Sequence, residues 1–129
     1  MSHEVVTDPQ MPRALGPYSP VVRVSDLLFL SAQTGVDQDT GQVPEGDFGD
    51  ECRQAFRNLE QALRAARSDL AQVVKMTVFY TDAALLPTIN AVFKEVFPVR
   101  PPARSAAIVG LAGGRRISMD AIAVVDPTR

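Results

Sequence analysis

One arginine stands out among the residues that could carry chemistry. Arg104 lies in the segment 103–109 (ARSAAIV), which is otherwise small and apolar. A guanidinium cannot be both buried and unpaired, because losing its hydration is strongly unfavourable. It must reach solvent, pair with a carboxylate of the protein, or bind the carboxylate or phosphate of a ligand through two parallel hydrogen bonds. The pattern alone favours a structural role, since arginines at sheet edges are common.

Other polar side chains have ordinary structural interpretations when each is taken alone. Tyr18 is expected in a turn or in the core, Ser31 in a strand, and Asn90 on a helix. Cys52 lies on the apolar face of an expected helix, which indicates an inert packed thiol. Six acidic residues lack the spacing of a calcium loop and are expected to form a solvated surface: Asp37, Asp39, Glu45, Asp47, Asp50 and Glu51.

The composition excludes several classes of function. Thirteen basic and fifteen acidic residues give a net charge of −2, which argues against a nucleic-acid binder. The single Cys52 excludes an internal disulfide and a cysteine-based metal cage, and the single His3 argues against a Ser-His-Asp triad. No apolar run approaches the ~18 residues of a membrane span, and we expect no signal peptide. We therefore expect one cytoplasmic domain over residues 1–129, with no membrane partner.

The elements that must position these side chains follow from the hydrophobic periodicity. Apolar residues recur every three or four positions over 48–66 and 86–97, which predicts two amphipathic helices, the first with Asp47 as N-cap. Strands are predicted over 18–24, 27–33, 73–80, 103–109 and 116–125, and Val5-Val6 could add a short one.

The face of two of these strands can also be predicted. In the strand 73–80, Val74 is expected to share a face with Met76, Val78 and Tyr80. The last strand is apolar on both of its faces.

This order of elements predicts an α+β fold. Two helices cannot cover both faces of a five- to six-stranded sheet, so they are expected to pack on one face of a mixed sheet as a two-layer sandwich. The second face of the sheet must be polar or covered by another copy of the chain. Because the last strand is apolar on both faces, the pattern favours an oligomer.

Six segments occur here in the order typical of one protein family. They are GPYS (16–19), FLSAQ (29–33), VVKMTVF (73–79), TIN (88–90), PARS (102–105) and DAIA (120–123). From about Val5 to Val125 the chain resembles the RidA family, also called YjgF/YER057c/UK114, of reactive-intermediate imine deaminases. The PARS segment is the most specific of the six.

The resemblance implies a chorismate-mutase-like fold that assembles as a homotrimer with clefts between its subunits. It implies hydrolysis of 2-imino acids such as 2-iminopropanoate and 2-iminobutanoate to 2-keto acids and ammonia, without a metal or cofactor. It assigns Arg104 as the clamp for the substrate carboxylate, and Tyr18, Ser31 and Asn90 as substrate-binding residues of the cleft.

Three departures from the family pattern bear on the mechanism. The family's glutamate on the last strand, thought to hold the attacking water, is Ser118 here, and a serine cannot act as a carboxylate base. Asp120 lies on the same face of the strand, about 6.6 Å further along, and could replace it. The frequent cysteine two residues after the arginine is Ala106, and the segment before Arg104 is shortened.

The leading prediction is therefore an imine deaminase with Arg104 and Ser118 in its catalytic site. The alternative is a trimer that binds a small keto or imino acid without efficient deamination, or acts on an aminoacrylate or 2-aminomuconate. Ribonuclease activity, reported for some relatives, fits poorly because the chain has no histidine pair for acid–base work.

Overall fold

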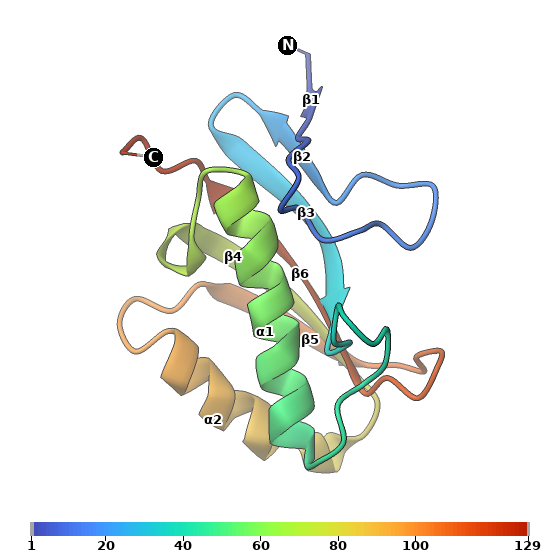
Figure 1. Ribbon diagram of the computed structural model, residues 1–129. Coiled ribbons are helices and arrows are strands. Elements are labelled where there is room, and N and C mark those ends of the chain that lie inside the picture. The colour runs from blue at the N-terminus through green and yellow to red at the C-terminus, as the bar shows by residue number, and fades with distance from the viewer. Residues whose placement is uncertain (1, 129) are drawn as a thin grey trace.

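The computed structural model describes residues 2–128, which form a mixed six-stranded sheet with two helices (Figure 1). The strands lie side by side in the order β1-β2-β3-β6-β4-β5. In chain order the elements are β1 (Glu4–Val5), β2 (Val21–Val24), β3 (Leu27–Thr34), α1 (Phe48–Ala65), β4 (Val73–Tyr80), α2 (Leu86–Val96), β5 (Ala103–Ile108) and β6 (Ile117–Val124). The predicted α+β architecture is confirmed.

The connections explain this strand order. β2 and β3 form the predicted hairpin, whose turn requires a positive φ of 54° at Ser25. β4 and β5 are parallel because α2 crosses over between them. β6 returns antiparallel between β3 and β4, so it is covered by a strand on each side.

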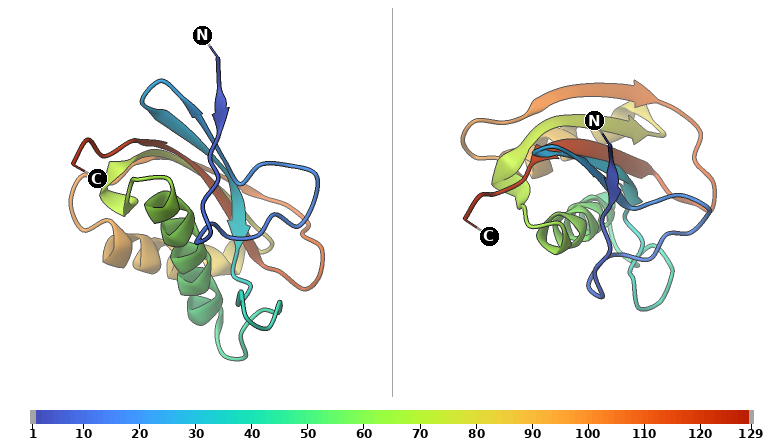
Figure 2. Two further views of the ribbon diagram at one scale, coloured as in Figure 1. Left: turned by 45° about the horizontal axis from the view of Figure 1, so that its top comes forward. Right: turned by 90° about the horizontal axis from the view of Figure 1, so that it is seen from above.

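Both helices pack against the same face of the sheet and lie in front of it in Figure 1, and Figure 2 shows the curvature of the sheet from above. Helix α1 begins at the predicted cap, where Asp47 Oδ1 accepts the backbone N–H of Asp50 at 3.0 Å. Rings of Phe56, Phe93 and Phe97 meet at centroid distances of 5.2–5.8 Å and join the two helices. Within residues 2–128 neither helix is long and apolar enough to cross a membrane.

The opposite face of the sheet, called the open face below, carries no helix within residues 2–128 and keeps large apolar side chains exposed. Leu27 and Phe29 of β3 are 41% and 42% exposed. The prediction that Val74 shares the buried face of β4 is wrong. The register between β4 and β6 shifts between Val73 and Lys75, so Val74 is an extra residue in a β-bulge and is exposed.

A second irregularity shapes β3. Its register against β6 shifts between Leu30 and Gln33, which places a bulge at Ser31 and Ala32. β2 ends at this point: its Val21 pairs with Leu30, and beyond that pair β3 has no strand neighbour on its outer edge. The irregular segment before β2 lies there instead, and the backbone N–H of Ser31 donates to the carbonyl of Pro20 at 2.9 Å.

One of the six acidic residues is not part of a solvated surface. Glu51 is fully buried on α1, where its Oε2 accepts the backbone N–H of Arg116 and its Oε1 accepts the Nε–H of the same residue, both at 2.7 Å. The ring of Phe48 lies 5.3 Å from the guanidinium carbon of Arg116. The prediction was wrong because Glu51 meets its cation only when β6 packs beside α1.

Candidate active site

Arg104 lies on β5, the edge strand of the sheet, and is exposed to solvent. It pairs with buried Met76 of β4, which turns its side chain toward the helix-covered side. There its Nη1 donates to Asn90 Oδ1 at 2.9 Å, and its guanidinium carbon lies 4.8 Å from the ring centre of Phe93. Among the described residues no carboxylate forms an ion pair with it.

Helix α2 provides both groups that hold this guanidinium. Asn90 and Phe93 are three residues apart, so they lie on the same face of the helix. The amide oxygen fixes one nitrogen, and the ring supports the plane through a cation–π contact. The remaining N–H groups can donate to a ligand carboxylate in a two-pronged geometry. Phe93 was not predicted as a site residue, although its spacing from Asn90 could have indicated it.

Tyr18, Ser31 and Asp120 meet on the other side of the molecule. Together with Leu30 and Ala32 they line a cavity of about 340 Å³ beside the bulge of β3. Ser31 Oγ donates to the carbonyl of Ser19 at 2.7 Å, which ties the segment before β2 to the sheet.

Asp120 is the carboxylate of this cavity. It lies on β6 directly opposite Thr77 of β4. Partial burial raises the pKa of Asp120 above its usual value, while a hydrogen bond from Thr77 and the charge of Lys75 act in the opposite direction. The Lys75 Nζ is itself held by Ser105 Oγ at 2.6 Å. A carboxylate with a raised pKa is a stronger base, so this group is suited to take a proton from water.

Ser118 shares the open face with Asp120 but is only 8% exposed, between Thr34 and Phe79 of the neighbouring strands. It is not among the residues that line the cavity of Asp120. Its catalytic role stays a prediction.

The predicted site residues therefore form two groups. Arg104 and Asn90 meet at the helix-covered side of β5, and Tyr18 and Ser31 meet Asp120 on the open side of β6 and β3. Because β4 lies between β5 and β6, the two groups do not converge within one chain. In residues 2–128 no three His, Cys, Asp or Glu side chains gather as metal ligands.

Comparison with known proteins points to one family. The family model described as "Endoribonuclease L-PSP" matches residues 9–125. The chain is similar to the human 2-iminobutanoate/2-iminopropanoate deaminase, with 36% identity over 124 residues that cover 95% of this chain and 90% of the human protein.

Two solved structures show the same fold. RidA from the Antarctic bacterium Psychrobacter sp. PAMC 21119 superposes with a TM-score of 0.87 and 30% identity, covering 95% of this chain and 99% of that one. TdcF of E. coli with bound serine has a TM-score of 0.87 and 32% identity, with the same coverage. The resemblance to RidA proteins is confirmed.

Proposed function

The chain belongs to the family of the endoribonuclease L-PSP model, which includes RidA proteins and imine deaminases, and we propose that it hydrolyses small 2-imino acids to 2-keto acids and ammonia. The proposal covers 2-iminopropanoate and 2-iminobutanoate, whose side chains carry no charge. The relatives named for this activity support it.

The observation that carries the proposal is the state of Arg104. Its guanidinium is held by Asn90 and Phe93 but forms no ion pair with a described carboxylate. A 2-imino acid brings its own carboxylate, so binding completes the ion pair and fixes the adjacent C=N carbon.

We propose that the active site lies between two subunits of a homotrimer. Within one chain, Arg104 lies at the helix-covered edge and the cavity with Tyr18 and Ser31 lies on the open side. Joining these halves takes a second copy of the chain. The exposed Leu27 and Phe29 of the open face supply apolar area for such an assembly, which should show three times the chain mass of 13.9 kDa by light scattering.

Asp120 is the general base of the proposed reaction. It takes a proton from a water molecule while the oxygen attacks the imine carbon, and the π electrons of the C=N bond move to nitrogen, which then receives that proton from Asp120. Asp120 next carries the proton of the new hydroxyl group to the nitrogen, so that ammonia leaves, the carbon becomes the keto group and Asp120 is again ionised. Ser118 is a weaker candidate for this role, because a hydroxyl is not a carboxylate base and this side chain is covered.

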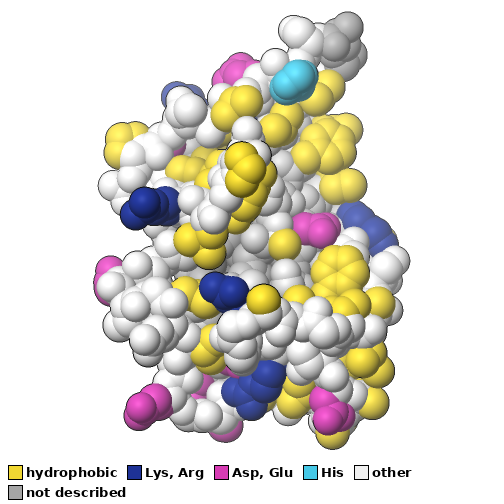
Figure 3. All heavy atoms as spheres, turned by 90° about the vertical axis from the view of Figure 1, so that its right-hand side faces the viewer, with side chains coloured by type: hydrophobic (Ala, Val, Ile, Leu, Met, Phe, Trp, Pro, Cys, Tyr) yellow, Lys and Arg dark blue, Asp and Glu magenta, His cyan; other side chains and the backbone are white. Residues whose placement is uncertain are grey.

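Two alternatives lead to different experimental results. One is a trimer that binds keto or imino acids without efficient turnover, or that prefers an aminoacrylate or 2-aminomuconate. The other is RNA cleavage, which the name of the family model suggests. His3 is the only histidine, the net charge is −2, and the side of the molecule in Figure 3 shows isolated cationic side chains rather than a gathered patch. These features favour the deaminase.

The test generates 2-iminobutanoate with an amino-acid oxidase and follows its loss with and without the protein. We expect the protein to accelerate hydrolysis and Arg104→Gln to remove the acceleration while the trimer remains folded. Arg57→Gln is the matched control, because Arg57 is an exposed arginine of α1 whose side chain donates to Gln54 Oε1, away from the proposed site. No acceleration by the wild-type protein would refute the proposal, and RNA cleavage that persists in Arg104→Gln would support the rival.

A further inference from the structure

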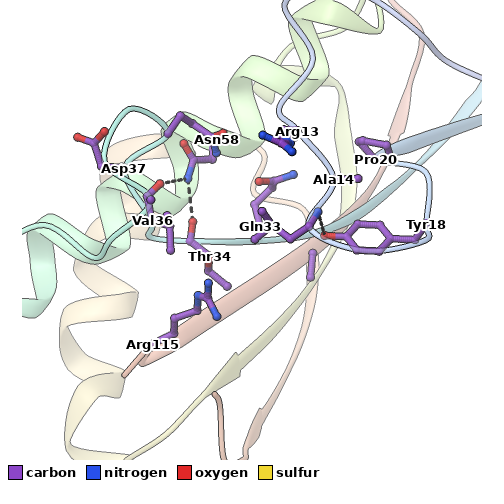
Figure 4. Close-up of a pocket in the computed structure, with 14 residues that line it drawn as sticks. Arg13, Ala14, Tyr18, Pro20, Gln33, Thr34, Val36, Asp37, Asn58 and Arg115 are labelled. Carbon is purple, nitrogen blue, oxygen red and sulfur yellow. Dashed lines mark hydrogen bonds between the residues drawn. The ribbon is translucent and has the colours of Figure 1, made fainter. Parts of the chain in front are cut away.

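A second, larger cavity lies next to the proposed site. It measures about 400 Å³ and lies where β3 extends beyond β2, beneath the irregular segment that contains Arg13 and Tyr18 (Figure 4). Figure 4 shows Arg13 and Arg115 on opposite sides of the cavity, with Gln33 and Thr34 of β3 between them. None of the predicted site residues except Tyr18 lines it.

Arg115 is the first sign that this cavity takes an anion. Its side chain is half-buried beside the glycine turn at Gly113 and Gly114, and its Nε is covered from solvent. Within the described residues this Nε has no hydrogen-bond partner, and no carboxylate forms an ion pair with Arg115. A covered N–H without an acceptor is unfavourable, and no described residue compensates it. Arg115 lines the cavity, and a ligand carboxylate there can bind its two Nη groups in a two-pronged hydrogen bond.

The other charged groups of the cavity leave it cationic. Arg13 is exposed and forms no ion pair with a described residue. Asp37 is the only acidic residue in the lining, and its Oδ1 already accepts the backbone N–H groups of Asp39 and Thr40 at 2.8 and 3.3 Å. Asn58 is likewise engaged, since its Nδ2 donates to the carbonyls of Thr34 and Val36.

The cavity adjoins the one that contains Asp120. Tyr18 and Ala32 line both, so the two spaces meet at these side chains. A substrate whose imine carbon lies at Asp120 can therefore extend past Tyr18 toward the two arginines. Apolar groups of Ala14, Leu15 and Pro20 line the same space and suit a short methylene chain.

We propose that this second cavity binds a distal carboxylate, so that the chain prefers 2-imino acids with a second acidic group on a short side chain. The inference rests on the proposed deaminase function and adds the substrate class. Arg115 receives the distal carboxylate in a two-pronged hydrogen bond, and Arg13 closes over it from the segment before β2.

The test compares imines that an amino-acid oxidase makes from glutamate and from 2-aminobutyrate. We expect a kcat/KM about tenfold higher for the acidic imine, as one charge-assisted pair provides. The preference is the kcat/KM for the imine of glutamate divided by the kcat/KM for the imine of 2-aminobutyrate. Arg115→Gln and Arg13→Gln should each lower this ratio by up to about tenfold. Calorimetric binding of 2-oxoglutarate and 2-oxobutanoate gives a second readout that needs no turnover, and Arg57→Gln should change neither.

The outcomes separate the inference from the function on which it rests. The second site is overturned if the protein turns over the imine of 2-aminobutyrate and shows no preference for the imine of glutamate. It is also overturned if both arginine variants retain such a preference. Loss of 2-oxoglutarate binding in both variants of a protein that turns over neither imine supports the second site and refutes the deaminase. Arg13→Gln keeps the test valid if Arg115→Gln fails to fold, because Arg13 lies exposed outside the sheet.

Discussion

Two arginines of this chain have similar surroundings and opposite pairing. Arg116 lies beside the ring of Phe48 and Arg104 beside the ring of Phe93, with 5.3 and 4.8 Å from guanidinium carbon to ring centre. Arg116 also meets the buried carboxylate of Glu51 at 2.7 Å. Arg104 donates to the neutral amide oxygen of Asn90 and, among residues 2–128, forms no ion pair with a carboxylate.

This difference separates a structural arginine from one that is available to a ligand. Glu51 is fully buried, so its charge is tolerated only because the backbone and side chain of Arg116 satisfy both oxygens. The pair thereby holds the start of β6 against α1. At Arg104 the ring and the amide fix the direction of the guanidinium but leave its charge uncompensated, which is what recognition of a carboxylate requires.

The largest expected effect comes from removing the unpaired arginine. Arg104→Ala should lower kcat/KM for 2-iminobutanoate about 10³-fold, because the charged fork that fixes the substrate is lost. Arg104→Lys should be nearly as damaging, since an ammonium cannot form the two-pronged bond. Steady-state kinetics measures the loss of activity and a thermal melt measures stability. The melting temperature should stay close to the wild-type value.

Arg116→Ala should show the reverse pattern. It leaves Glu51 buried without its cation, which should lower the free energy of unfolding by about 3 kcal/mol. Denaturant titration measures this loss, and kinetics corrected for the folded fraction should change little. If Arg104→Ala destabilised the fold as much as Arg116→Ala, the distinction between the two arginines would be wrong.

The next effect concerns Asp120, the proposed base on the open face. Asp120→Asn should lower kcat by about 10²-fold, because the amide cannot accept the proton of water. In the wild type the activity should fall as the pH drops through the raised pKa of Asp120, since only the ionised form is a base. The pH profile of kcat/KM checks this, and the acid limb should be absent in Asp120→Asn.

Ser118 is the comparison for that experiment. Ser118→Ala should change kcat much less than Asp120→Asn, because Ser118 is covered. Ser118→Glu should add little if Asp120 already serves as base. A strong gain in Ser118→Glu together with an unaffected Asp120→Asn would instead return the water-holding role to position 118.

A smaller effect is expected when Arg104 is given its own carboxylate. Asn90→Asp replaces the neutral amide that accepts from Arg104 by a carboxylate, like that of Glu51 beside Arg116. This new carboxylate would compete with the substrate carboxylate for the Arg104 guanidinium. We expect KM to rise about tenfold, with less change in kcat, because the substrate must displace an exposed ion pair. An unchanged KM for 2-iminobutanoate would mean that the charge state of Arg104 does not decide substrate binding.

The smallest effect on activity is expected at Cys52, which is buried on α1 next to Glu51. Burial raises the pKa of the Cys52 thiol to about 12, so the reactive thiolate is absent at neutral pH. Iodoacetamide should modify this thiol only after unfolding, and Cys52→Ala should change kcat/KM less than about twofold. Rapid labelling of the native protein would contradict the burial of this thiol.

Local sequence pattern was enough to predict the helices and strands and the family. The helix over Phe48–Ala65 and the strands of the hairpin follow from periodicities that one segment carries by itself. Arg104 was identifiable as a candidate from its place in a small apolar strand, but that pattern alone favoured a structural role, and its role as a carboxylate clamp came from the family resemblance. The order of six short segments was sufficient for the resemblance that the family comparison confirms.

Which distant segments pack together, and which of their charges pair, was decided only by the tertiary structure. Glu51 has the same local character as the exposed acids near it and is buried only because β6 lies against α1. The bulges at Val74 and Ser31 arise from strand registers that no single strand encodes. Likewise Asp120 lines a cavity and Ser118 does not, because neighbouring strands cover the two unequally. Local sequence determines the period of a strand, whereas exposure and charge pairing depend on which strands become its neighbours.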